Sequence, residues 1–130
     1  MNQELYLKKF EMELNELGKL TNRKNRDYAG KENAFSNFEK IEQMTHGRIK
    51  LEDGLLVRMT DKIARISNLL EHSAYVEAEK ITDTLQDLAV YSIILKIYLE
   101  YKLDMSSKKD QVNKIETRPL PPGPHYSRTE

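Results

Sequence analysis

The stretches VRMTDKIARISNLL (residues 57–70) and ITDTLQDLAVYSIIL (residues 81–95) decide the fold that we predict for this chain. Apolar residues of the first stretch recur at spacings of four, three and four residues: Met59, Ile63, Ile66 and Leu70. The second stretch carries a similar stripe: Ile81, Leu85, Leu88, Ser92, Leu95 and Leu99. Such spacing is one face of an α-helix. Both stretches therefore predict helices, and we expect their apolar faces to form the core.

The opposite face of the first helix carries a polar stripe with the same period: Arg58, Asp61, Arg65, Asn68 and His72. One interpretation is a solvated face with Asp–Arg pairs one turn apart, each contributing a few tenths of a kcal/mol. The other is a face turned toward a ligand, where Arg58 and Arg65 bind phosphate or carboxylate oxygens and Asn68 adds a donor.

The second helix has an acidic face that continues as an apolar one. Glu79, Asp83 and Asp87 follow one another at helical spacing, and Val90, Tyr91 and Ile94 come next: the carboxylates should therefore lie at the edge of a covered surface. Like charges one turn apart repel and call for compensation. Lys62, Arg58 or Arg65 can supply it through a salt-bridge network, and so can a divalent cation such as Mg²⁺, which prefers carboxylate oxygens.

Composition limits the class of protein. The chain has 130 residues, enough for one domain, and its 21 basic and 21 acidic side chains balance. This balance argues against bulk nucleic acid or an acidic membrane as partner. The chain contains no cysteine, and its start, MNQELYLKKF, has no apolar signal core. The longest apolar run is interrupted by Lys96, so we expect a cytoplasmic protein that does not span a membrane.

The segment before the first core helix combines a predicted helix and a predicted loop. Periodic apolar residues predict a helix over residues 4–22, and residues 23–37 read as a loop rich in Asn, Asp, Gly and Lys. Basic and polar side chains beside an aromatic ring can hold a phosphate and stack on a base. The residues concerned are Lys24, Asn25, Arg26, Asp27 and Tyr28. Alternatively, Tyr28 only pins the loop to the core, as we expect of Phe35 and Phe38.

The remaining boundaries follow from capping and turn signals. Ser36 and Glu39 predict a capping box for a short helix over residues 37–44, which His46 and Gly47 close. Asp53 is the expected cap of the long helix that ends at Leu70. A short connection over residues 71–77 predicts that the two long helices are antiparallel.

The second long helix should end near residue 103. This gives one helical domain over residues 1–104 and a polar tail over residues 105–130, which contains all four prolines and should be flexible. The predicted fold is thus an all-α bundle built on an antiparallel pair of long helices.

Four segments together resemble a known family. They are K-N-x-D-Y-x-G (residues 24–30), the segment 35–38, V-R-M-T-D-K-I-x-R-I (residues 57–66) and V-x-x-E-x-I-x-D-T-L-x-D-L-A-x-Y (residues 76–91). In order and spacing they resemble the phage and bacterial "nucleotide modification associated domain" family of the first type. The residues on this pattern are Lys24, Asn25, Asp27, Tyr28, Arg58, Asp61, Lys62, Arg65, Asp83, Asp87 and Tyr91. The resemblance implies an all-helical, often phage-encoded protein associated with nucleotide metabolism or DNA-base modification.

A more distant similarity is to the MazG-like all-α nucleotide pyrophosphohydrolases, which hold Mg²⁺ between acidic helices. Their pattern is E-E-x-x-E on one helix and E-x-x-D on the next. This chain departs from it, with Glu79, Asp83 and Asp87 on one helix and only Asp61 on the other.

Three hypotheses of function follow. The first is a nucleotide-binding protein that sequesters a nucleotide or nucleotide-derived signal without turnover, through Lys24, Asn25, Asp27, Tyr28 and the face of Arg58, Asp61, Lys62, Arg65 and Asn68. The second is an Mg²⁺-dependent phosphohydrolase in which Glu79, Asp83 and Asp87 hold the metal. The third is a helical oligomerisation module without a small ligand. In each case we expect a homo-oligomer, a dimer or higher, and no catalytic residue is assigned.

Overall fold

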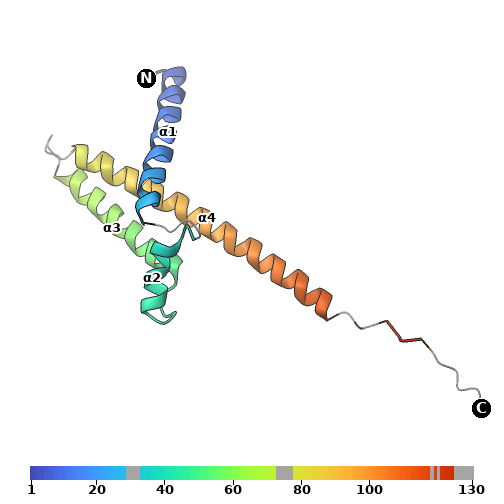
Figure 1. The fold of residues 1–130 in the computed structure, drawn as a ribbon. Helices are drawn as coiled ribbons and strands as arrows, with labels where there is room; N and C mark the ends of the chain where they lie inside the picture. The colour runs from blue at the N-terminus through green and yellow to red at the C-terminus, as the bar shows by residue number, and fades with distance from the viewer. Residues whose placement is uncertain (29–32, 73–77, 118, 120, 125–130) are drawn as a thin grey trace, which may run out of the picture. The chain divides into compact units, whose positions relative to one another are not determined.

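The computed structural model describes residues 1–28, 33–72, 78–117, 119 and 121–124, and the side chains of residues 24–28 and 78–80 lie outside this description. Within these ranges the chain forms four helices and no strand: α1 (Gln3–Tyr28), α2 (Ser36–Met44), α3 (Leu51–Glu71) and α4 (Ala78–Glu116) (Figure 1). The predicted all-α class is therefore confirmed. The chain divides into two units, Met1–Leu99 and Glu100–Glu130, which are described separately below.

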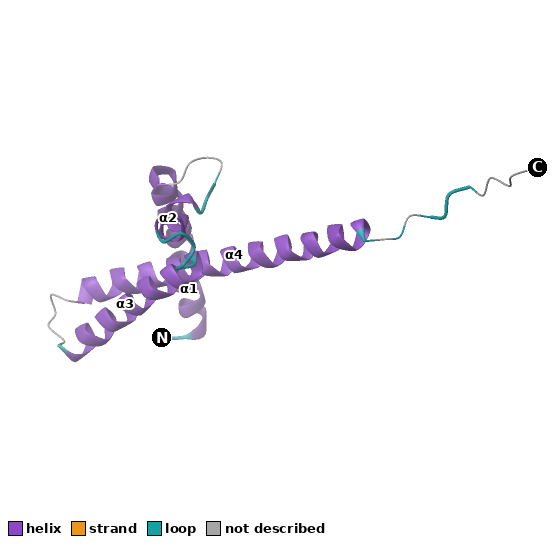
Figure 2. Ribbon diagram, turned by 90° about the horizontal axis from the view of Figure 1, so that it is seen from below, coloured by secondary structure: helices purple, strands orange, loops and turns teal. Residues whose placement is uncertain are grey.

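The predicted pair of antiparallel helices is present in the first unit. α3 and the first part of α4 run side by side in opposite directions (Figures 1 and 2). An ion pair joins them, with Lys62 Nζ 3.1 Å from Asp87 Oδ2. The two residues are equally far along the chain from the connection between the helices, as expected for an antiparallel pair.

α1 is longer than the sequence pattern predicts. We expected it to end at Asn22 and a loop to begin at Arg23, but the helix continues to Tyr28. The reason lies in the residues themselves, because Arg and Lys have high helix propensity and neither Gly nor Pro occurs between Arg23 and Tyr28. A polar segment without apolar periodicity is therefore helical here.

The start of α2 also differs from the prediction. Its N-cap is Phe35, and Ser36 makes no side-chain cap bond, so the predicted capping box is wrong. Asn33 instead braces the turn that leads into the helix. Its Oδ1 accepts a hydrogen bond from the Phe35 N–H at 3.0 Å, and its Nδ2 donates to Glu39 Oε2 at 2.8 Å. The Asn side chain closes a turn just before the helix, and the helix then begins at Ser36.

α3 is capped from α2 and not by Asp53. The helix begins at Leu51 after an extended Lys50, so Asp53 already lies in its first turn and the predicted cap is wrong. The Leu51 N–H donates to Glu42 Oε2 at 3.3 Å, and Lys50 Nζ lies 3.7 Å from Glu42 Oε1. The turn between α2 and α3 has positive φ at His46 (51°) and Gly47 (78°), which confirms the predicted close of the short helix.

Few of the described side chains are completely buried, and the two buried leucines lie in the first turns of α3. Leu51 is 0% exposed and Leu55 is 2% exposed, and Thr84 of α4 is the third buried residue. Gly54 lets α2 approach, because a Cβ at this position would lie 3.1 Å from Ile41 Cγ2. The predicted core stripe of α3 is wrong in part, since Ile63 and Leu70 are exposed. That stripe extends beyond the region that α2 covers.

α4 is also longer than predicted. It does not end near residue 103 but continues to Glu116. Neither Gly nor Pro occurs between Leu103 and Glu116, and Asp104 and Lys108 are spaced as a favourable pair one turn apart. The first proline, Pro119, comes only after the helix has ended. Of the helices in the described ranges, none combines the length and the apolar character that a bilayer crossing requires.

Candidate functional site

A cavity of about 420 Å³ in the first unit is the candidate site. All four helices and the turn before α2 contribute to its lining: Leu20, Thr21, Ala34, Phe35, Asn37, Phe38, Arg58, Asp87, Val90, Tyr91, Ile94 and Ile97. Cavities that hold small ligands in proteins have volumes of roughly 300–1,000 Å³ and are mostly apolar with a few polar groups. Both its size and its lining match that description.

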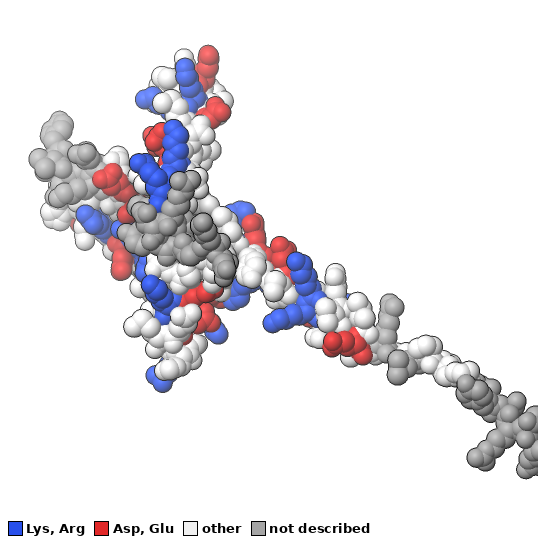
Figure 3. All heavy atoms as spheres, in the orientation of Figure 1, with Lys and Arg blue, Asp and Glu red and all other residues white. Residues whose placement is uncertain are grey.

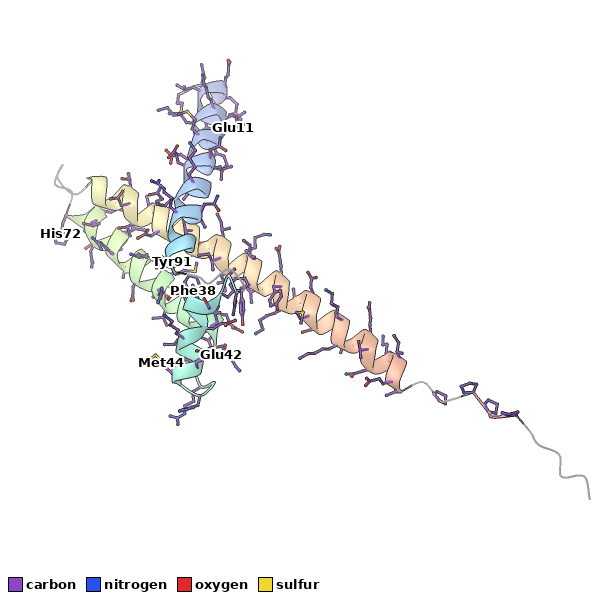
Figure 4. All side chains as sticks on the ribbon, viewed as in Figure 1. Glu11, Phe38, Glu42, Met44, His72 and Tyr91 are labelled. Carbon is purple, nitrogen blue, oxygen red and sulfur yellow. The ribbon has the colours of Figure 1, made fainter. Side chains whose placement is uncertain are left out.

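Aromatic side chains form much of the cavity wall. Phe35, Phe38 and Tyr91 line it, and Figure 4 shows that Phe38 and Tyr91 come from α2 and α4. Phe35 packs edge-on against Tyr98, with the ring centroids 5.1 Å apart and the planes at 70°. The hydrogen bond from the Phe35 N–H to Asn33 Oδ1 also holds the backbone at this position. The Phe35 ring is thus held by a neighbour from α4, and the aromatic side chains form an apolar surface suited to a planar group.

Arg58 brings a positive charge to this wall. Its guanidinium carbon lies 5.7 Å from the centroid of the Phe38 ring, within the range of a cation–π contact. The contact orients a side chain that is otherwise exposed at the cavity edge. A guanidinium beside an aromatic ring can bind an oxyanion while a planar group stacks on the ring.

Asp87 supplies the negative charge of the same cavity. It is half buried and pairs with Lys62 of α3 at 3.1 Å. The side chains of the pair are 25% and 34% exposed, so water screens the attraction only in part. Asn37 adds an amide to the lining. The polar groups in the described lining are therefore one cation, one anion paired with a lysine, one amide, and the hydroxyl groups of Thr21 and Tyr91.

The lining contributed by α4 follows the pattern seen in the sequence. Asp87, Val90, Tyr91 and Ile94 lie three, four and seven residues apart, so they share one face of the helix, and all four line the cavity. The acidic face that continues as an apolar face is thus the wall of a cavity. Asp83, one turn earlier, is exposed.

The structure brings some predicted site residues together and leaves others apart. Arg58 and Asp87 line the cavity, and Lys62 reaches it through Asp87. Asp61, Arg65 and Asn68 are exposed on α3, and the described lining does not include them. Lys24, Asn25, Asp27 and Tyr28 lie in the last turns of α1, but their side chains are outside the described part of the chain.

The three predicted metal ligands lie along the first part of α4. Glu79 lies in the first turn of α4 with its side chain outside the description, Asp83 is exposed, and Asp87 pairs with Lys62. Among the described residues no group of three His, Cys, Asp or Glu side chains is arranged to hold a metal ion.

Sequence reasoning missed several lining residues. We assigned Phe35 and Phe38 only to packing, and we did not single out Leu20, Thr21 or Asn37. Phe35 and Phe38 do pack, but they also line the cavity. The sequence did contain a signal for them: aromatic side chains cluster around α2, and α4 has an apolar face. Both surfaces are apolar and must be covered by other apolar side chains, so they could be expected to meet.

The comparisons with known proteins give no relative: neither a protein family, a curated protein nor a solved structure matches this chain.

Proposed function

We propose that this chain binds a nucleotide or a nucleotide-derived signal in the cavity between its helices and releases it chemically unchanged. The observation that carries the proposal is the convergence of three aromatic side chains and one arginine on a single cavity. Phe35, Phe38 and Tyr91 provide apolar planar surface for a base, and Arg58 lies at the edge where a phosphate would meet it. Base stacking on such rings contributes roughly 1–3 kcal/mol per base.

The size of the cavity supports the same class of ligand. About 420 Å³ accommodates a nucleoside with its phosphates directed toward the opening. Asn37 can recognise the edge of a base, since an amide both donates and accepts hydrogen bonds. The resemblance to the nucleotide modification associated domain family points to nucleotides independently of the cavity, and membership in that family is part of the proposal.

Binding without turnover is favoured by the state of Asp87. Its carboxylate oxygen Oδ2 lies 3.1 Å from Lys62 Nζ. The lysine therefore already balances the negative charge of Asp87, which a magnesium ion would otherwise bind. The alternative is an Mg²⁺-dependent phosphohydrolase that uses Asp87 with Asp83 and Glu79. In that case Lys62 would have to move away from Asp87 when the metal binds.

The test is a thermal-melting screen of the full chain against nucleoside and deoxynucleoside mono-, di- and triphosphates, cyclic dinucleotides and ADP-ribose derivatives, each with and without Mg²⁺. We expect one class to raise the melting temperature and to be recovered intact by mass spectrometry, because ligand binding stabilises the folded state. A ligand recovered shortened only with Mg²⁺ would establish the phosphohydrolase, and a panel without any shift would contradict both functions.

Arg58→Gln and Arg65→Gln form a matched pair for locating the site. Both arginines are exposed on α3, but only Arg58 lines the cavity. Arg58→Gln should weaken binding by about tenfold to a hundredfold, since a hydrogen bond to a charged group contributes roughly 1.5–3 kcal/mol. Arg65→Gln should leave the affinity unchanged. If both substitutions weaken binding equally, the ligand lies on the outer face of α3 and not in the cavity.

A further inference from the structure

The end of α4 carries a second pattern that the cavity does not use. In the second unit, residues of one helical face recur at spacings of four, three, four and three: Tyr101, Met105, Lys108, Val112 and Ile115. This is the 3.5-residue repeat of a coiled coil, in which Met105 and Val112 occupy position a and the other three occupy position d. Four of the five residues are apolar, so the repeat describes a narrow seam.

The apolar side chains of this seam are accessible to solvent. Every residue from 100 to 117 is exposed, and Met105, Val112 and Ile115 are 40%, 51% and 68% exposed. A fully exposed helix of this length is marginal in water even with a favourable composition. Ser106, Ser107 and Asn113 lower the helix propensity of this stretch, although it contains neither Gly nor Pro. A partner that covers the seam would supply the missing stability.

We infer that the partner is a second copy of this chain, bound in parallel through the seam of α4. The charges beside the seam support this occupant. In a parallel pair, a residue at position g faces the residue at position e five places further along the other chain. Asp104 occupies g and Lys109 occupies e, so each copy would offer Asp104 to Lys109 of the other copy.

The antiparallel arrangement of the same stretch is less favourable. In such a pair e positions face each other, so Lys109 of one copy would lie opposite Lys102 or Lys109 of the other, according to the register, and these like charges repel. Zero net charge on each chain raises no long-range barrier to self-association. Acidic and basic side chains are also mixed over this part of α4 in Figure 3, without a block of one sign.

Leu103 provides the matched control for the seam. It lies in the same stretch of α4 and is 68% exposed, but it falls on the opposite side of the helix from Val112 and the rest of the seam. The same substitution at Leu103 and at Val112 therefore changes hydrophobicity and charge equally, and only the second change lies in the proposed interface.

The first experiment is sedimentation equilibrium of the full chain and of the variants Val112→Asp and Leu103→Asp at micromolar concentration. We expect a dimer for the unchanged chain and for Leu103→Asp. We expect at least about tenfold weaker association for Val112→Asp, because the parallel seam would bury two facing carboxylates. A monomeric unchanged chain, or a dimer that Val112→Asp leaves intact, would overturn the proposal.

The second experiment tests the direction of the chains. Because the protein contains no cysteine, a single introduced thiol reports one contact. Val112→Cys should form a disulfide between the two copies under mild oxidation, since equivalent a positions face each other in a parallel pair, and Leu103→Cys should not. If Val112→Cys stays reduced in a chain that still dimerises, the parallel seam is wrong. Neither experiment depends on the nucleotide proposal, because Tyr101 to Ile115 do not line the cavity.

Discussion

α4 has two parts that differ in what covers their apolar side chains. From Asp87 to Tyr98 the helix meets residues of its own chain, with Tyr91 in the cavity wall and Tyr98 against Phe35. From residue 100 to 117 every residue is exposed, although apolar side chains continue at helical spacing. One helix thus carries an apolar face that lines a cavity and, further along, apolar side chains that are exposed.

The difference between the two parts shows what hydrophobic periodicity in the sequence can predict. It indicates which face of a helix is apolar, but not which other segment or chain covers that face. Along the first part, residues of α1 and α2 line a cavity together with the apolar face of α4. The apolar face of the second part has the same physical requirement. The four predictions below test this contrast, beginning with the largest expected effect.

Leu55→Ala should be the most damaging change, because Leu55 is buried where α3 meets α2. We expect the free energy of unfolding to fall by about 2–5 kcal/mol, from lost burial and the cavity left behind. Leu56→Ala is the control, since its neighbour in the same helix is 55% exposed and should change stability by less than about 0.5 kcal/mol. Urea unfolding followed by circular dichroism measures both. Equal losses would contradict the small buried core.

Lys108→Leu should strengthen the association between two copies of the chain through the end of α4. It thus tests the exposed part of the molecule, whereas Leu55→Ala tests the packed part. Lys108 is the polar member of the seam, and a polar residue in a coiled-coil core lowers stability. We expect the dimer to dissociate about tenfold less readily, which is about 1.4 kcal/mol. Ser107→Leu adds a similar side chain away from the seam and should not tighten the dimer. Sedimentation equilibrium of both variants distinguishes packing in the seam from nonspecific hydrophobic association.

Alanine at two glycines compares an open helix with a packed one. Gly18 of α1 has nothing within 4 Å of an added Cβ, and Gly54 of α3 has Ile41 Cγ2 at 3.1 Å. Gly18→Ala should stabilise the protein by about 0.5–1 kcal/mol through helix propensity. Gly54→Ala should gain less, because Ile41 must move. Denaturant midpoints measure the difference in stability between the two variants. A larger stabilisation by Gly54→Ala would show that α2 can shift away from α3 at little cost.

The smallest effect is expected from the ion pair between Lys62 and Asp87. A double-mutant cycle with Lys62→Met and Asp87→Asn should give a coupling free energy of about 0.2–1 kcal/mol that decreases with added salt. The pair joins α3 to the covered part of α4, so the coupling free energy tests whether these two helices lie side by side. A coupling near zero at low salt would place Asp87 apart from Lys62.

The choice of Asp87 partner also bears on ligand binding. If a magnesium ion replaces Lys62, adding Mg²⁺ should abolish the coupling in the same cycle. If the lysine remains, Mg²⁺ should act only through ionic strength, as an inert salt of equal strength does.

Local signals determined the secondary structure well. Hydrophobic periodicity predicted α3, α4 and the first turns of α1, and the pair His46–Gly47 marked the turn after α2. These features depend on neighbours within about one helical turn, which the sequence states directly. The helix ends were less predictable. α1 and α4 both continue through polar residues, because polarity alone does not stop a helix and only Gly or Pro does so reliably.

The sequence by itself determined an all-α chain, an antiparallel pair of long helices and an acidic face that runs into an apolar one. Only the tertiary structure decided that Phe35, Phe38, Arg58 and Tyr91 line one cavity, and that Ile63 and Leu70 stay exposed. The physical reason is distance along the chain. A helix face is set by residues a few positions apart, whereas a cavity requires segments from three or four helices to meet, and no local pattern encodes which of several apolar faces will pack together.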